Sequence, residues 1–456
     1  MTAEERAARD VVPLRTAAKV WTLVALQSFG GPAGQIAVMQ RALVDDRRWI
    51  GRGRFLHALN FCTILPGPEA TQLAVYIGWL LNGVRGGMLA GVLFVLPGAI
   101  ALFALSAVYV AFGTTTLVTA VFGGISAAVL AIVAQAVVRV GRRALGRASL
   151  VSIAVVSFLA LALFAVPFPV VVLAAGGVGW LLGRHRPGSM TPDAADEEDG
   201  PAPLVADDAL HAERPSVRRS GLVLAVGITV WWVPVLTVVA ATGRDSTLST
   251  EGFFFSGAAL VTFGGAYAVL TYVAQRAVET YGWLSPGEMV SGLGLAETTP
   301  GPLIMVLQFV GFLGAYRSPG GLDPWVAATI GAALTTWVTF VPAFLLVFLG
   351  APYVERLRHN RKVADALSGV TAAVVGVIAN LAVFFALHTL FDEVDEVDRG
   401  PVHTSVPVWS SIRPVEVAIA AVGFVLIFRL RWSVLRTLGV CALLGLLASA
   451  VGLSVP

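Results

Sequence analysis

Two Pro-Gly-Pro triplets stand beside carboxylates, inside stretches that are apolar enough to lie within a membrane. The first stretch reads "ILPGPEATQLAVYIGWLLNG" (64–83) and places Glu69 directly after the triplet. The second reads "AETTPGPLIMVLQFVGFLGAY" (296–316) and places Glu297 shortly before it. Proline ends one helix and suits the first turn of the next. A helix start carries unpaired N–H groups and a partial positive charge, so two such breaks favour an anion site.

Two Phe-Gly-Gly elements form a second pair of breaks, in "FGGPAGQIAVMQR" (29–41) and "FGGAYAVLTYVAQR" (263–276). Glycine lets a backbone approach a ligand closely, although such glycines also serve as ordinary helix contacts. Polar side chains gather around all four breaks. The candidate substrate-binding residues are Phe29, Gly30, Gly31, Pro32, Gln35, Arg41, Asn60, Pro66, Gly67, Pro68, Glu69, Thr71 and Gln72 in the first half, and Phe263, Gly264, Gly265, Tyr272, Arg276, Glu297, Thr298, Thr299, Pro300, Gly301 and Pro302 in the second.

Glu69 and Glu297 are candidate proton carriers, because ionisable residues are costly at membrane depth and an adjacent bound anion favours the protonated acid. Simpler roles compete with this one. Glu69 suits the first turn of a helix, where a negative charge is favourable. Glu297 could form a structural ion pair with Arg276 or Arg317.

Enzymatic and metal chemistry find no support in the residue pattern. The six histidines and two cysteines show no metal-ligand spacing. The apolar stretches offer no nucleophile–base pair, so we expect neither an enzyme nor a cofactor. The arginines occur in short clusters between apolar runs, which argues against a nucleic-acid partner.

The composition is that of a membrane protein with several spans. Of 456 residues, 57% are hydrophobic and 13% are charged, with a net charge of +3, whereas about a quarter of residues are charged in soluble domains. We therefore expect an all-α polytopic membrane protein. The predicted organisation is a cytoplasmic tail (1–18), a first transmembrane repeat (19–183), a cytoplasmic linker without assigned structure (184–220), a connecting helix (221–242) and a second repeat (252–453). No cleaved signal peptide is expected.

The two halves match in order. Besides the two kinds of break, "FVLPGA" (94–99) pairs with "TFVPAF" (339–344), and "GISAAVLAIV" (124–133) pairs with "GVTAAVVGVI" (369–378). Arginine-rich loops of one half correspond to arginine-poor loops of the other: 41–54 is basic and 276–288 is not. By the positive-inside rule the halves have opposite orientations. The expected fold is an inverted-topology repeat with broken or re-entrant helices at the Pro-Gly-Pro and Phe-Gly-Gly motifs.

The sequence resembles the chromate ion transporter family in its long, two-domain form. The resemblance rests on "SFGGPAGQIAVMQ", "LPGPEATQLAVYIGWLLNGVRGGMLAGVLFVLPG", "TFGGAYAVLTYVAQRAVETYGWLSPGEMV" and "AETTPGPLIMVLQFVGFLGAY", and covers nearly all of 18–453. Two departures make the halves inequivalent: Ala266 stands where the first half has proline after Phe-Gly-Gly, and Leu303 stands where it has Glu69.

This resemblance implies export of chromate across the cytoplasmic membrane, conferring chromate resistance, with sulfate as a competitor. The membrane potential could drive this export, alone or together with proton movement. The expected mechanism is alternating access, in which the inverted repeats exchange conformations. The alternative is a permease for sulfate or another oxyanion on the same fold. The expected partners are the transported anion and the lipid bilayer, and the sequence leaves a homodimer open.

Overall fold

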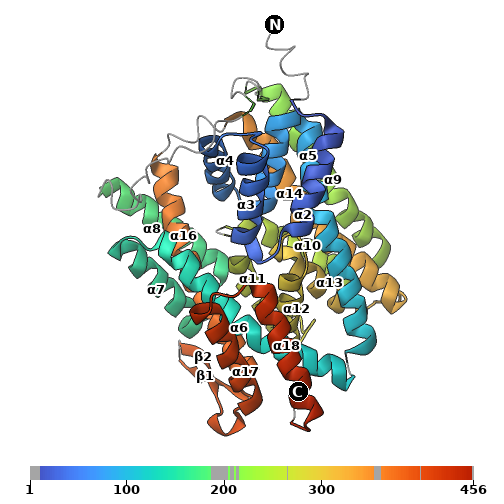
Figure 1. The fold of residues 1–456 in the computed structure, drawn as a ribbon, viewed down its shortest axis with the longest axis vertical. Helices are drawn as coiled ribbons and strands as arrows, with labels where there is room; N and C mark the ends of the chain where they lie inside the picture. The colour runs from blue at the N-terminus through green and yellow to red at the C-terminus, as the bar shows by residue number, and fades with distance from the viewer. Residues whose placement is uncertain are drawn as a thin grey trace. The chain divides into compact units, whose positions relative to one another are not determined.

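The computed structural model describes residues 11–113, 115–185, 204–205, 210–211, 215–263, 265–353, 361–400 and 402–453. The chain is almost entirely helical over these ranges (Figure 1). Six of the described helices are long and apolar enough to cross a membrane. The expectation of an all-α polytopic membrane protein is confirmed.

The helices follow the predicted apolar stretches. The first half holds α2 (Leu14–Gln27), α3 (Gly31–Gln40), α4 (Arg52–Ile64), α5 (Glu69–Phe112), α6 (Thr116–Ala144), α7 (Ala148–Phe164) and α8 (Phe168–His185). After α9 (Val217–Thr242), the second half holds α10 (Thr247–Val261), α11 (Ala266–Gln275), α12 (Pro286–Thr298), the 3-10 turn η4 (Leu303–Met305), α13 (Val306–Arg317), α14 (Pro324–Gly350), the 3-10 turn η5 (Ala351–Tyr353), α16 (Arg361–Leu390), α17 (Pro414–Phe424) and α18 (Val434–Ala450).

The expected helix breaks are present. Each Phe-Gly-Gly element separates two helices, α2 from α3 and α10 from α11, and each Pro-Gly-Pro triplet separates α4 from α5 or α12 from α13. The helix α5 is itself interrupted at Asn82 and Gly83, and Gly83 has a φ of +60° that glycine adopts readily. Short helices joined at such breaks confirm the predicted broken-helix architecture.

The duplication also appears in fine backbone geometry. The helices α3 and α11 each continue into a π-helical turn, η1 (Arg41–Asp46) and η3 (Arg276–Thr280). Each turn closes in the same way: the Trp49 N–H donates to the Leu43 carbonyl, and the Trp283 N–H donates to the Ala277 carbonyl, both at 2.8 Å. A third π-helical turn, η7 (Val425–Arg429), follows α17.

The chain forms two compact units that do not follow its sequence halves. Unit 1 contains residues 1–103, 193–266 and 299–360, and unit 2 contains 104–192, 267–298 and 361–456. Each unit therefore combines helices from both halves. All four helix breaks begin or end within unit 1.

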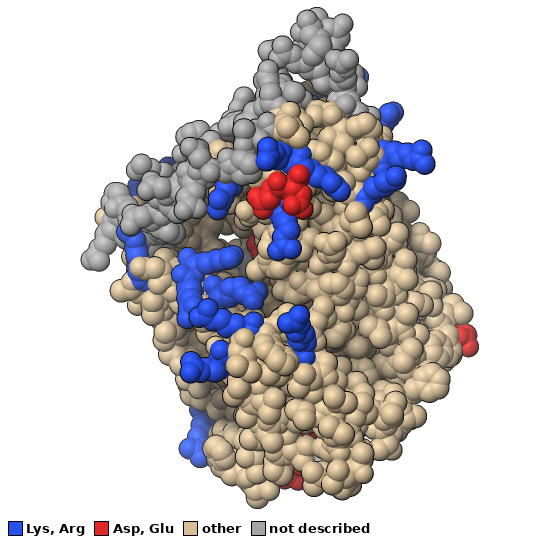
Figure 2. Space-filling view, in the orientation of Figure 1, with Lys and Arg blue, Asp and Glu red and all other residues tan. Residues whose placement is uncertain are grey.

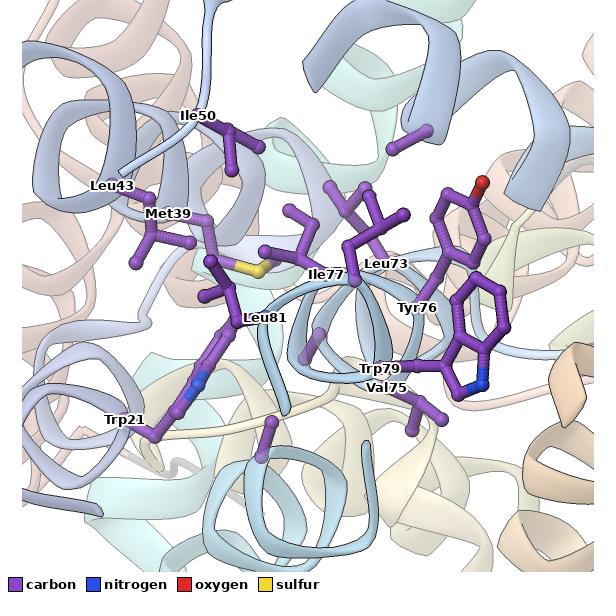
Figure 3. Packing of buried hydrophobic residues seen from close by; sticks show 14 of the residues in the cluster. Trp21, Met39, Leu43, Ile50, Leu73, Val75, Tyr76, Ile77, Trp79 and Leu81 are labelled. Carbon is purple, nitrogen blue, oxygen red and sulfur yellow. The ribbon is translucent and has the colours of Figure 1, made fainter. Parts of the chain in front are cut away.

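The core of unit 1 lies between α2, α3, α4 and the first part of α5 (Figure 3). Trp21, Met39 and Leu73 are almost completely buried in it. The described residues of the predicted linker also pack here: Leu210 is buried, and the His211 ring lies edge-on to Trp79 at 4.8 Å. Leu210 and His211 thus pack against unit 1, and both ends of the predicted linker lie in the helices α8 and α9, although the sequence assigns the linker no structure.

Unit 2 is organised around α16, which packs against α6, α7 and α8. The helices α6 and α18 approach closely through a reciprocal glycine pair. A Cβ on Gly124 would lie 2.2 Å from the Cys441 carbonyl oxygen, and one on Gly445 would lie 2.2 Å from that of Ala120. One element was not predicted: β1 (Val394–Arg399) and β2 (Val402–Pro407) form an antiparallel hairpin, preceding the 3-10 turn η6 (Trp409–Ser411).

The surface suits a lipid environment. Large apolar side chains on the long helices are exposed, including Ile100, Val156 and Leu173 at 62%, 65% and 74%. Figure 2 shows a face on which most atoms belong to uncharged residues and the lysines and arginines gather in one part. Apolar exposure of this extent is unusual for monomeric soluble proteins and is typical of a membrane protein.

Candidate functional site

The first Pro-Gly-Pro triplet is fixed by a residue from the other half of the chain. Gly67 has a φ of +130°, and its N–H donates to the Thr262 carbonyl at 2.7 Å. Thr262 directly precedes the second Phe-Gly-Gly element. Within its own half, the triplet is held by Gln72, whose Nε2 donates to the Pro66 carbonyl at 2.8 Å.

The second triplet repeats this arrangement with the halves exchanged. Gly301 has a φ of +105°, and its N–H donates to the Ser28 carbonyl at 2.9 Å. Ser28 directly precedes the first Phe-Gly-Gly element. Gln35, on α3, donates from Nε2 to the Gly301 carbonyl at 2.6 Å. The two breaks are therefore closed crosswise, and each half completes the broken backbone of the other.

The proline-bearing helices α5 and α14 add a second crosswise contact. A Cβ on Gly98 of α5 would lie 2.6 Å from the Pro300 carbonyl oxygen. Ala343 of α14, at the matching position, has its Cβ 3.4 Å from where a Cβ of Gly67 would be. Each triplet thus packs against the proline-bearing helix of the opposite half. The small residues at these two positions permit that approach.

The crosswise closure places the start of α5 beside the second Phe-Gly-Gly element, and the second Pro-Gly-Pro triplet beside the start of α3. At the first of these places, Glu69 Oε1 lies 3.8 Å from the position of a Cβ on Gly265, the glycine before α11. Glu69 is only partly buried and begins α5. A carboxylate at this place is favourable next to the N–H groups of the helix start.

The donors that face this site differ from those expected. The Gly67 and Gly301 amides already donate to Thr262 and Ser28, so they lock the breaks in the described arrangement. A helix start leaves the amides of its first turn without an intrahelical acceptor, and at α5 the first such bond runs from the Gln72 N–H to the Pro68 carbonyl at 3.0 Å. The Thr71 hydroxyl, in that turn, is fully buried and has no hydrogen-bond partner among the described residues. These groups remain suitable for an oxyanion.

Glu297 lies in unit 2 and has a partner that the sequence did not suggest. The Tyr267 hydroxyl, in the first turn of α11, donates to Glu297 Oε1 at 2.5 Å. The carboxylate is 1% exposed, and Oε2 has no hydrogen-bond partner among the described residues. Arg276 instead donates to Thr280. Glu297 is therefore held by a hydrogen bond from a tyrosine. The sequence had suggested an ion pair with an arginine as the structural role of this residue.

Tyr267→Phe is expected to destabilise unit 2 by about 1–3 kcal/mol, because it leaves both oxygens of a buried carboxyl group without a partner. The measurement is thermal unfolding of the detergent-solubilised protein. Tyr109→Phe is the matched control, since its hydroxyl lies 3.4 Å from Glu288 in a partly exposed place. Equal losses in both variants would contradict a special role for the Tyr267–Glu297 bond.

Several predicted site residues lie away from the breaks. Asn60 is exposed, and its carbonyl accepts a hydrogen bond from Thr63. Arg41 and Arg276 are exposed at the start of the two π-helical turns. Tyr272 stacks on Phe168 at 6.0 Å in unit 2.

The remaining members of the predicted site lie close to the two triplets. The Thr298 hydroxyl donates to the Leu295 carbonyl at the end of α12. Thr299 is buried next to the second triplet. Gly264 lies outside the described residues.

Unit 2 also contains an open pocket of about 360 Å³ beside the β-hairpin. Its polar lining includes Glu279, Glu396 and Asp398, and His403 Nδ1 lies 2.6 Å from Asp398 Oδ1. Burial and the nearby Glu396 charge raise the pKa of Glu279, while a hydrogen bond with the Gln275 side chain opposes the shift. No lysine or arginine is among the described lining residues. This acidic pocket does not suit an anion.

Sequence reasoning missed the residues that close the site. Ser28 and Thr262 act through their backbone carbonyls, which any residue type could supply, so their side chains did not point to this role. The one sequence feature that could have identified them is that each directly precedes a Phe-Gly-Gly element. Glu251 was also missed: it is fully buried, and no described side chain donates a hydrogen bond to either carboxylate oxygen. An isolated acid in an apolar stretch was the signal there.

Comparison with known proteins gives consistent results. A chromate transport protein of Pseudomonas aeruginosa is 35% identical over 361 residues, covering 77% of this chain and 76% of that protein. One from Cupriavidus metallidurans is 30% identical, covering 80% of each chain, and a probable one from Synechococcus elongatus is 27% identical, covering 80% and 82%. No solved structure matches this chain significantly.

The family model described as "Chromate transporter" matches residues 16–180 and 251–446, which together are most of the chain. Its two segments contain both Phe-Gly-Gly elements and both Pro-Gly-Pro triplets. The relatives are named as transport proteins, so the expectation that this protein is not an enzyme is confirmed. The crosswise-closed breaks are thus features of a chain that belongs to the chromate transporter family.

Proposed function

We propose that this protein exports the chromate dianion across the cytoplasmic membrane by alternating access. The observation that carries the proposal is the crosswise closure, in which Gly67 bonds to Thr262 and Gly301 bonds to Ser28. It brings each Pro-Gly-Pro triplet to the opposite Phe-Gly-Gly element within unit 1, and the helix starts at such breaks are the natural binding elements for oxyanions. The names of the relatives identify chromate as the anion to test first.

The proposed binding site lies in unit 1, between the start of α5 and the second Phe-Gly-Gly element. The first-turn amides of α5, the Thr71 hydroxyl and the backbone before α11 would donate to the chromate oxygens. Glu69 occupies this place in the described arrangement, where its carboxylate substitutes for an anion. Chromate and an ionised Glu69 repel each other, so anion binding favours the protonated or displaced Glu69. Glu69 thereby couples proton and anion binding.

Two local bonds suggest how access alternates. The paired halves have opposite arginine patterns, as expected of inverted repeats. In such a carrier the two halves exchange conformations, and the equivalent contacts of each half open in turn. The Gly67–Thr262 and Gly301–Ser28 bonds are equivalent contacts of this kind. We propose that one opens toward the cytoplasm and the other toward the outside.

The energetics agree with export. Moving a dianion out of a negatively charged interior releases about 4.6 kcal/mol per 100 mV, twice the value for a single charge. The membrane potential is therefore sufficient to drive chromate outward. Proton coupling adds control over the cycle and is not required as an energy source.

The decisive test is uptake of radiolabelled chromate by inside-out vesicles that contain the protein. We expect uptake to rise when the membrane is energised and excess sulfate to inhibit only in part. Vesicles without the protein provide the control. Faster transport of sulfate than of chromate would identify the protein as a sulfate permease, and no transport of either anion would contradict the proposal.

A further inference from the structure

Glu251, near the start of α10, is a buried acid outside the proposed anion site. It is 0% exposed, and no described side chain donates a hydrogen bond to Oε1 or Oε2; the Ala315 backbone on α13 is the one described group that stabilises its ionised form. An ionised carboxylate without a charged partner is very costly to bury. Such a residue in a membrane protein usually has a function.

The helices around Glu251 leave space for its carboxyl group. A Cβ on Gly331 of α14 would lie 2.8 Å from Glu251 Oε2, so the absence of that side chain makes room for the carboxyl group. One helical turn along α14, Thr335 is also 0% exposed, and its hydroxyl has no partner among the described residues. Thr335 Oγ1 in turn occupies the space that a Cβ on Gly311 of α13 would need, so the glycine permits this contact. Two polar side chains with no described side-chain partner thus share a glycine-lined junction.

All three helices of this junction lead to the anion site. The helix α10 runs to Thr262, which accepts the Gly67 N–H bond. The helix α13 follows the second Pro-Gly-Pro triplet after the 3-10 turn η4, and α14 carries Ala343, which packs against Gly67. A change in the packing around Glu251 is therefore transmitted to both triplets through rigid helices.

No described charged side chain at this junction balances Glu251. The helix α14 contains no ionisable residue, and α13 carries only Tyr316 and the exposed Arg317 in its last turn. The helix α9 carries Arg218 and Arg219 in its first turn, whereas Gly252 packs against Val235. That contact is about 24 Å of helix away from Arg219.

We propose that Glu251 is a proton-binding site that controls the packing of α10, α13 and α14 during transport. The protonated acid is neutral and fits the dry junction that the structure describes. Loss of the proton creates a buried charge, which draws water or the Thr335 hydroxyl toward it and loosens the junction. Proton binding at Glu251 therefore favours the arrangement in which both triplets are closed. This inference rests on the proposed function.

The test compares net transport with exchange in wild-type and Glu251→Gln protein. Glutamine resembles the protonated acid in shape and charge. In the wild type, net chromate uptake should change with pH by up to about tenfold per unit where a single carboxyl group titrates. In Glu251→Gln, measured at a chromate concentration that saturates binding, we expect this pH dependence to be lost, and both net uptake and exchange to stay at the rate that the wild type shows when Glu251 is protonated. Glu393→Gln, at an exposed carboxylate, should retain the pH dependence.

Two outcomes would overturn the inference: wild-type pH dependence in a folded Glu251→Gln protein, or pH-independent uptake by the wild type. If Glu251→Gln fails to fold, Thr335→Val provides the second test. Removing the hydroxyl that stabilises the ionised acid should move the midpoint of the pH profile upward, and an unchanged midpoint would also overturn it.

A measurement on purified protein separates this inference from the transport proposal. Infrared difference spectroscopy should detect the C=O stretch of a protonated carboxylic acid that is absent in Glu251→Gln. If the wild type transports no chromate, the proposed function fails; the infrared band still tests whether Glu251 binds a proton.

Discussion

Gly301→Ala is expected to abolish chromate transport and to destabilise unit 1 by about 2–6 kcal/mol. Two costs add at this position. A φ of +105° is strained for alanine, at about 1–3 kcal/mol, and the new Cβ would lie 3.3 Å from the Gly98 Cα in a packed backbone crossing, at about 1–3 kcal/mol more. The crosswise bond from Gly301 to Ser28 cannot form without this approach.

Gly321→Ala separates these two costs. Gly321 has a similar φ of +96°, but nothing lies within 4 Å of its Cβ position. This variant should be destabilised only by the backbone strain of about 1–3 kcal/mol, and it should transport chromate normally. Thermal unfolding in detergent and vesicle uptake measure the two effects. Equal losses in both variants would show that backbone strain, not the crosswise contact, makes Gly301 necessary.

Glu69→Gln is expected to bind chromate about a hundredfold more tightly at neutral pH and to lose the pH dependence of binding. Its carboxylate lies at the start of α5 beside Gly265, so it repels a dianion bound at the proposed site. At about 5 Å and an effective dielectric constant near 20, the repulsion of even one pair of unit charges is about 3 kcal/mol. Equilibrium binding of radiolabelled chromate to purified protein at two pH values measures both effects.

Glu69→Asp is the matched control, because it retains the charge on a shorter side chain. It should preserve pH-dependent binding. Weaker binding by Glu69→Gln would mean that the carboxyl group assists the anion, and the proposed competition would be wrong. The tighter chromate binding expected of Glu69→Gln also distinguishes it from Glu251→Gln. The latter variant should change the pH dependence of net transport and leave the affinity for chromate unaltered.

The sequence was sufficient to predict where the helices break. Proline and positive-φ glycine impose those breaks locally, so Pro66–Pro68 and the Phe-Gly-Gly elements could be recognised without tertiary structure. The crosswise closure could not be predicted in the same way. It depends on the backbone carbonyls of Ser28 and Thr262, whose side chains instead bond within their own helices to Val24 and Ala258.

The partners of buried acids were also beyond sequence reasoning. Charge complementarity suggested an arginine for Glu297, but proximity in the fold supplied the Tyr267 hydroxyl. The hairpin formed by β1 and β2 was not predicted, because its alternation of polar and apolar residues is short. Inverted orientation, substrate contacts and proton coupling stay predictions until the experiments above are done.

The crosswise closure has a consequence for biogenesis. During synthesis, the Gly67 amide enters the membrane long before its acceptor, the Thr262 carbonyl, has left the ribosome. In the same way, the Ser28 carbonyl is inserted long before its donor, the Gly301 amide, has been made. Lipid offers no hydrogen-bond partner to such groups. The newly inserted first half must therefore keep both breaks near water or the insertion machinery until the second half arrives, and folding of unit 1 finishes only after translation has passed Gly301.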